Sequence, residues 1–365
     1  MRKRKEYIRF TFKKGTTGYE ILQVLKEAGG SYPEEELKKL LSDKQPETVR
    51  KVIRRLERAG YVLRKKGVRR EIIVVLSTQG QKVLNVEMVI GNTAQKITRQ
   101  GNAAVVNMMF KQSVPLGVQE EILEYTYYLS KKEIMDQEPG SQKVLITSRL
   151  MGVYVHYGEY IPVFKFGSSM YWVNHVEQQI KEYLEHRIFD APVTKAIFLI
   201  EDYDHVAMQF MVPPENKRRY GESLRETLEL STCYEKIFMF ACDKIGIEQL
   251  RFFRSYAAIE ELFLRSVFED SERYVEKGSV LDGYINEIGS VVLFNGDIIQ
   301  IKRLCRILNS NMLEKLNIIC YDFQENFLRT AFAAWSENVF FNSYSLEEVM
   351  DVIDSAEDMT EYDGI

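Results

Sequence analysis

The chain has 365 residues, of which 45% are hydrophobic and 12% aromatic, so it can bury a large core and should form two or three domains. Its net charge of −4 hides an asymmetry, because residues 1–85 hold 22 Lys and Arg against 10 Asp and Glu and the remainder carries −16. No apolar run approaches the roughly 20 residues of a membrane span, and no signal peptide is recognisable, so we expect a soluble, cytoplasmic protein without membrane contact.

Two short helices are predicted near the start of the first domain, residues 1–85. Residues 19–28 place apolar side chains at helical spacing, and the pattern stops at Gly29 and Gly30. Ser31 is expected to cap a second helix, with Pro33 near its first turn. That helix ends a few residues before the next one begins, as a helix-turn-helix requires.

A third helix is predicted between Pro46 and Gly60, because proline favours the first helical position and glycine the position after the last. Its apolar residues recur at helical spacing and predict one buried face. The opposite face carries five cations, which we expect in or over the major groove of double-stranded DNA, where arginine reads guanine. These are Arg50, Lys51, Arg54, Arg55 and Arg58.

A hairpin is predicted over residues 61–77, with a basic tip around Gly67 that should neutralise DNA phosphates. The next segment, Leu76–Leu84, is similar to the LT-x-x-G-x-x-x-L ending of many bacterial winged-helix domains. Helix and hairpin together predict an N-terminal winged helix-turn-helix domain. The hairpin cations are Arg64, Lys65, Lys66, Arg69 and Arg70.

A helical connector is predicted over residues 86–141. It contains a helix at 93–111, with Lys96 and Arg99 on its polar face, and ends in the candidate linker Glu138–Ser141.

Residues 142–365 predict an α/β domain. A strand hairpin at 144–167 and a helix at 168–188 precede short apolar strands that alternate with helices, a pattern typical of a largely parallel sheet flanked by helices. Asp297 and Ser345 are placed to start two of these helices. Because the domain is acidic, we expect it to bind a protein partner or a second copy of the chain. The other predicted strands are 195–202, 236–243, 290–296, 315–322 and 338–344.

Few residues point to catalysis. P-loop, dinucleotide-binding, zinc-protease and serine-hydrolase motifs are absent, and no two of the four cysteines form a C-x-x-C pair, so we expect no cofactor, no metal and no catalytic residue. Acids at predicted strand ends leave a Mg²⁺-dependent nuclease as an alternative, because carboxylates meeting at one sheet edge can hold Mg²⁺. These acids are Glu201, Asp202, Asp204, Asp243, Asp322 and Glu325.

The segments LSTQG, ITRQGNAAVVNMMFKQSVPLG and SRLMGVYVHYGEYIPVFKFGSSMYWVNHVEQQIKEYL resemble the replication-relaxation family of plasmids and integrative conjugative elements of Gram-positive bacteria. The similarity covers roughly residues 18–202, with Trp172 and Glu177 at family positions, whereas Lys165 and Phe166 stand where the family has a polar pair. It implies a DNA-binding accessory protein of replication or conjugative transfer. The implied α/β domain is related to nucleases, restriction-endonuclease-like and degenerate, since Glu159 and Lys165 lack the E-x-K spacing.

The sequence therefore predicts a non-catalytic DNA-binding protein of a plasmid or other mobile element. One alternative is a winged-helix transcriptional regulator whose α/β domain responds to a ligand or partner and which binds its operator as a dimer. The second alternative is the nuclease.

Overall fold

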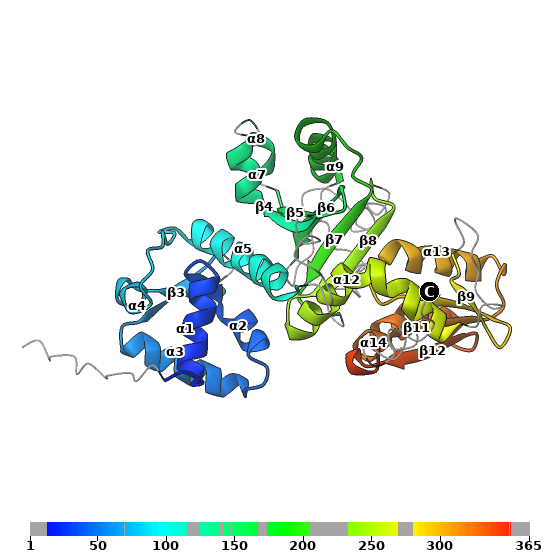
Figure 1. Ribbon diagram of the computed structural model, residues 1–365, viewed down its shortest axis with the longest axis horizontal. Helices are drawn as coiled ribbons and strands as arrows, with labels where there is room; N and C mark the ends of the chain where they lie inside the picture. The colour runs from blue at the N-terminus through cyan, green and yellow to red at the C-terminus, as the bar shows by residue number, and fades with distance from the viewer. Residues whose placement is uncertain are drawn as a thin grey trace, which may run out of the picture. The chain divides into compact units, whose positions relative to one another are not determined.

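The computed structural model describes residues 13–68, 70–114, 125–138, 140, 142–146, 148–166, 174–203, 233–268, 280–349 and 351. The fold is mixed α/β, as predicted, and the chain forms two compact units (Figure 1). The first unit holds residues 1–112 and 242–246, and the second holds residues 113–241 and 247–365. None of the described helices is long and apolar enough to cross a membrane.

The first unit contains five helices and a three-stranded sheet among its described residues, counting only helices that lie wholly within it. The predicted third helix is observed with its proline at the first position, and the helix predicted at 93–111 is observed one residue later. The elements are α1 (Thr17–Glu27), β1 (Ser31–Pro33), α2 (Glu34–Leu40), α3 (Pro46–Arg58), β2 (Val62–Lys66), β3 (Ile72–Leu76), α4 (Thr78–Val83) and α5 (Ala94–Gln112).

The sheet of the first unit is antiparallel, with strand order β1-β3-β2, and both of its faces are covered. Ile73 and Val75 point to one side and form a buried cluster with Ile97 of α5. Helices α1 and α2 pack against β3 as well, and Figure 1 draws them on the side opposite α5. Helix α5, which we expected in a connector, is therefore part of the first unit's core.

Ser31 does not cap a helix, so this prediction is wrong. Residues Ser31–Pro33 instead pair with β3, where Ser31 lies opposite Val75, and Pro33 occupies the N-cap of α2 without a side-chain hydrogen bond. The backbone of this short segment pairs with β3 and so forms the third strand of the sheet. A proline is tolerated there because β1 is an edge strand, where a missing N–H leaves no central ladder bond unmade.

The segment after β3 ties the sheet to the end of α3. The Ser77 hydroxyl donates a 2.5 Å hydrogen bond to the carbonyl of Gly60 and accepts a 3.0 Å bond from the N–H of Gly80, which caps α4. A Cβ at Gly80 would collide with the carbonyl oxygen of Tyr61. The Ser77 hydroxyl thus satisfies two backbone groups, and the glycine at position 80 permits the close approach of the two segments.

The described residues of the second unit form two mixed sheets rather than the single sheet that we predicted. The first has strand order β4-β5-β6-β7-β8, antiparallel up to β6 and parallel from there. The second has order β12-β11-β10-β9, parallel except for the β9–β10 pair. The strands are β4 (Thr126–Ser130), β5 (Leu150–His156), β6 (Glu159–Lys165), β7 (Lys195–Ile200), β8 (Lys236–Ala241), β9 (Gly283–Ile285), β10 (Ile288–Val292), β11 (Leu316–Tyr321) and β12 (Val339–Tyr344).

The helices Asn174–Tyr183, Ile298–Asn309 and Asp322–Ala331 follow the predicted alternation, whereas the long helix Lys244–Val267 was not predicted. Asp297 caps α13 by accepting a 3.0 Å hydrogen bond from the N–H of Ile299, and Ser345 and Glu348 form the expected capping box. The elements are α7 (Lys131–Gln137), α8 (Gln142–Leu145), α9 (Asn174–Tyr183) with the π-helical turn Leu184–Phe189, α12 (Lys244–Val267), α13 (Ile298–Asn309), α14 (Asp322–Ala331) and the 3₁₀ turn Ala333–Trp335.

One hydrophobic core is common to the two sheets of the second unit, and it includes Phe198 of β7 and Ile318 of β11. The outer edge of β8 is closed by the loop before α13. The N–H of Ile237 donates to the carboxylate of Asp297 (3.1 Å), and the N–H of Met239 donates to the carbonyl of Asn295 (3.2 Å). Strand β8 thus ends the first sheet without leaving these two donors unpaired.

A buried hydrogen-bond network adds to this junction. The hydroxyl of Tyr203, after β7, contacts the carbonyl of Met239 and the side chains of Gln249 and Gln324. Both glutamines also donate to the carbonyl of Phe294. Because buried polar groups are costly when unpaired, this network favours a single arrangement of the two sheets.

Candidate nucleic-acid interface

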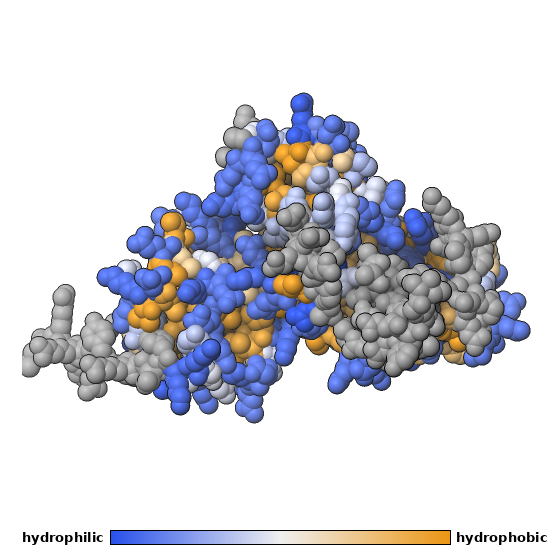
Figure 2. All heavy atoms as spheres, in the orientation of Figure 1, coloured by the Kyte–Doolittle hydropathy of each residue, from blue (hydrophilic) through white to orange (hydrophobic). Residues whose placement is uncertain are grey.

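Helix α3 separates its apolar and basic residues cleanly. Val49, Ile53 and Leu56 are fully buried against the rest of the first unit. The cations at positions 51, 54, 55 and 58 are three or four residues apart, so they form one stripe on the opposite face. Figure 2 shows hydrophilic residues along the lower edge of the first unit, where Figure 1 labels α3.

The stripe on α3 is exposed to solvent. The four side chains Lys51, Arg54, Arg55 and Arg58 are exposed, and among the described residues no carboxylate lies within 4.0 Å of Lys51, Arg54 or Arg58. Exposed guanidinium groups without an internal carboxylate partner are available to phosphates and base edges.

Arg50 lies at the edge of this stripe. It is half-buried, and its guanidinium is 3.7 Å from the carboxylate of Glu47, one turn earlier on α3. A contact of this length between side chains that are still largely open to solvent contributes little to stability. Arg50 therefore remains a candidate DNA contact, with part of its charge offset by Glu47.

Arg64, in the hairpin, has an internal partner. Its Nε donates a 2.7 Å hydrogen bond to the carboxylate of Glu34, whose side chain is only 3% exposed. Lys38 is the other cation near Glu34, at 4.0 Å. The structure therefore assigns Arg64 to neutralising a buried carboxylate at the start of α2.

Lys65 also points inward. It lies opposite Ile73 on the face of the sheet that packs on α5, and its ammonium group donates to the carbonyl of Gly91 at 3.3 Å. Lys66 and Arg70 are exposed, and Arg70 adopts the left-handed conformation with φ of 66°. Arg69 lies outside the described residues.

The tip of the hairpin is attached to α5 through Thr98, a residue that the sequence analysis did not single out. The Thr98 hydroxyl accepts a 3.0 Å hydrogen bond from the N–H of Val68 and donates a 2.6 Å bond to the carboxylate of Glu71. Val68 itself is 57% exposed at the tip. A threonine 30 residues from its partner carries no local signal, so only the tertiary structure identifies this role.

Lys96 and Arg99 of α5 are exposed, as their predicted polar positions require. Gln100, their neighbour, instead accepts a 2.7 Å hydrogen bond from the N–H of Gly91 and donates to the carbonyl of Val89. Exposed basic residues of the first unit thus lie on α3, on the hairpin and at the start of α5, and others, such as Lys26 on α1 and Lys82 on α4, lie elsewhere on the unit.

The strand-end acids do not gather into a metal site in the described part of the chain. Asp243 accepts from the N–H of Gly246 at the start of α12, Asp322 accepts from the N–H of Phe323, and Glu325 pairs with Arg329 at 2.6 Å. Among the described residues, no group of three or more His, Cys, Asp or Glu is placed to hold a metal ion. Asp204 and Trp172 lie outside the described residues, as does the side chain of Glu177.

No protein-family model, curated protein or solved structure matches this chain.

Proposed function

We propose that the chain is a non-catalytic protein that binds double-stranded DNA through a winged helix-turn-helix in its first unit. The observation that carries this proposal is the exposed stripe of Lys51, Arg54, Arg55 and Arg58 opposite the buried face of α3. A helix that presents cations in this way fits the major groove, which admits one α-helix.

The arrangement of the first unit supports this proposal. A winged helix-turn-helix has three helices followed by a two-stranded wing, often with a short strand after the first helix, and the elements from α1 to β3 follow this order. Lys66 and Arg70, in the wing, lie in exposed positions suited to phosphate contacts. Because the remainder of the chain is acidic, the positive charge of this domain is hard to attribute to a need for solubility alone.

The place of this activity in a mobile element rests on the resemblance to replication-relaxation proteins. On that basis we propose an accessory role in plasmid replication or conjugative transfer, in which the first unit recognises a DNA site and the acidic second unit binds a protein partner or a second copy of the chain. Nothing in this role requires bond breaking by the chain itself.

Fluorescence-anisotropy titration of the full chain against a random duplex pool tests the proposal. We expect binding that weakens steeply as salt rises, because Lys and Arg release condensed counterions from DNA. The same samples, incubated with and without Mg²⁺ and separated on a gel, should contain intact DNA. Salt-independent or absent binding contradicts the proposal, and cleavage that needs Mg²⁺ favours the nuclease instead.

Lys66→Ala should weaken binding to all duplexes alike and reduce the slope of log affinity against log salt by about one unit, since Lys66 is an exposed wing cation. Lys65→Ala is the matched variant, and it should change the slope less because Lys65 already binds the carbonyl of Gly91. Titrations at several salt concentrations measure both slopes. Equal slopes for the two variants would show that the wing is assigned incorrectly.

A further inference from the structure

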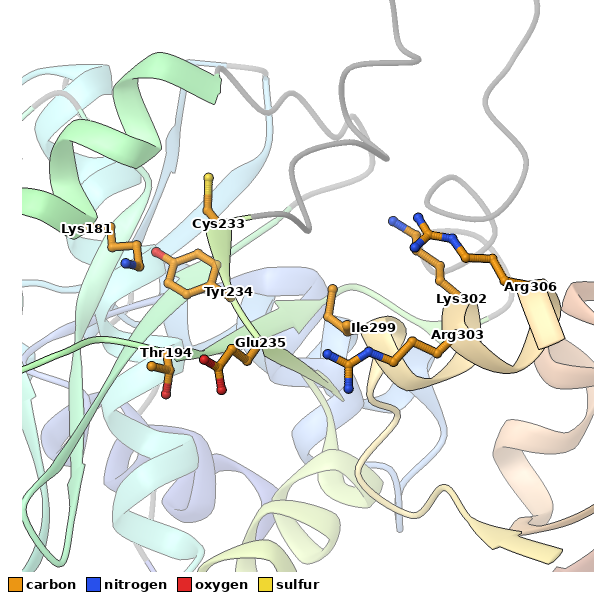
Figure 3. A pocket seen from close by; sticks show the side chains of 9 residues that line it. All are labelled: Lys181, Thr194, Cys233, Tyr234, Glu235, Ile299, Lys302, Arg303 and Arg306. Atoms are coloured by element: carbon orange, nitrogen blue, oxygen red, sulfur yellow. The ribbon is translucent and has the colours of Figure 1, made fainter. Parts of the chain in front are cut away.

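A cavity of about 490 Å³ lies in the second unit beside α13 (Figure 3). Its walls come from α9, the residues just before β7 and β8, and the outward face of α13. The volume is within the range typical of small-molecule sites. The lining residues are Lys181, Thr194, Cys233, Tyr234, Glu235, Ile299, Lys302, Arg303 and Arg306.

The cavity is strongly basic although its unit is acidic. Four of its lining residues are Lys or Arg and one is Glu. Lys181 is paired with Glu185 at 2.7 Å. For Arg303 and Arg306, by contrast, no carboxylate of the described residues lies within 4.0 Å, and both side chains are exposed. Arg303 and Arg306 therefore line the cavity without a carboxylate partner among the described residues, and Lys302 lines it from the same helix.

Lys302 and Arg306 are one turn apart on α13 and extend to the same side in Figure 3. Two like charges at this spacing repel each other, and an anion bound beside them would weaken that repulsion. Burial, and after it the neighbouring Arg306 charge, lower the pKa of the Lys302 ammonium group to about 8.

We propose that this cavity binds a small phosphate-bearing molecule, with Lys302, Arg303 and Arg306 holding its phosphate groups. Arginine suits this task because its guanidinium forms two parallel hydrogen bonds to phosphate oxygens, and lysine adds a compact charge. Thr194 and Glu235 offer hydrogen-bonding groups at the opposite wall for the hydroxyl groups of an organic remainder, and Ile299 offers an apolar surface. This site is separate from the proposed DNA interface on α3.

Isothermal titration of the full chain with inorganic pyrophosphate and, separately, with ATP tests this proposal. We expect saturable binding of at least one probe, and tighter binding of ATP if the organic remainder contributes. Arg306→Gln should weaken the binding about tenfold, the scale of one lost charge-assisted hydrogen bond. The matched control, Arg187→Gln, removes an exposed arginine that does not line the cavity and should leave binding unchanged.

Two results would overturn the proposal: neither probe binds, or the two variants bind equally. If neither probe binds and Arg306→Gln lowers duplex DNA affinity, the cations belong to a nucleic-acid surface. Thermal unfolding of both variants confirms that the second unit is intact, and Lys302→Met, which keeps the buried stem, provides an independent loss of charge. Because the titrations contain no DNA, their outcome does not depend on whether α3 binds DNA.

Discussion

Replacing Arg54 and Arg55 together by alanine should weaken duplex binding about a hundredfold, because each arginine that contacts a base or phosphate contributes about 1–3 kcal/mol. Both side chains lie on the exposed face of α3, whereas the buried residues Val49, Ile53 and Leu56 are untouched, so the variant should keep its fold. Anisotropy titration measures the affinity, and circular dichroism and thermal unfolding report on the fold.

The control for this experiment is Lys26→Ala with Lys82→Ala, which removes two exposed charges from the same unit at sites on α1 and α4. Non-specific attraction depends on the net charge, so this control should lose only a small part of the affinity. Unchanged binding by the α3 variant, or an equal loss by the two variants, would mean that α3 does not contact DNA directly.

Arg64→Met should destabilise the first unit by about 3 kcal/mol, because it leaves the buried carboxylate of Glu34 without its closest cation. Lys38, 4.0 Å from Glu34, offsets part of this loss. Urea unfolding followed by a probe specific for the first unit measures the change. DNA affinity of the folded variant should stay close to that of the parent chain, which distinguishes Arg64 from Lys66.

The double variant Glu34→Leu with Arg64→Met sharpens this prediction. Replacing both members of a buried ion pair by apolar residues is often neutral or stabilising, so the double variant should regain most of the stability that the single variant loses. If Arg64→Met unfolds at the same urea concentration as the parent chain, the pair with Glu34 is not structural. A large fall in DNA affinity at unchanged stability would return Arg64 to the proposed DNA contacts.

Local signals predicted most of the described elements. Pro46 and Gly60 mark the two ends of α3, Asp297 caps α13, and Ser345 caps the segment after β12. These positions could be predicted because each residue acts on its immediate neighbours in sequence. Ser31 was misassigned because serine suits both a helix cap and a short strand. Its pairing with Val75, which is distant in sequence, places it in a strand. The division of the second unit into two sheets could not be predicted from the sequence either, because it depends on which distant strands pair.

The candidate site shows the same limit. The helical pattern alone identifies the exposed stripe on α3, because burial of one face determines the other. The hairpin pattern could not separate Lys66 from Arg64 and Lys65, whose partners lie 30 and 26 residues away in sequence. The cavity beside α13 could not be predicted from the sequence, because its walls come from four separate stretches of chain.

The network around Tyr203 has a consequence for synthesis of the chain on the ribosome. Tyr203 and Gln324 are 121 residues apart, so this hydrogen bond closes only after nearly the whole chain has emerged. Most contacts of the first unit, by contrast, form within residues 13–112, and this unit can begin folding much earlier. During that interval the second unit lacks its C-terminal strands and helices. The edge of β8, whose N–H groups have not yet met Asn295 and Asp297, is then the surface that a chaperone would need to protect.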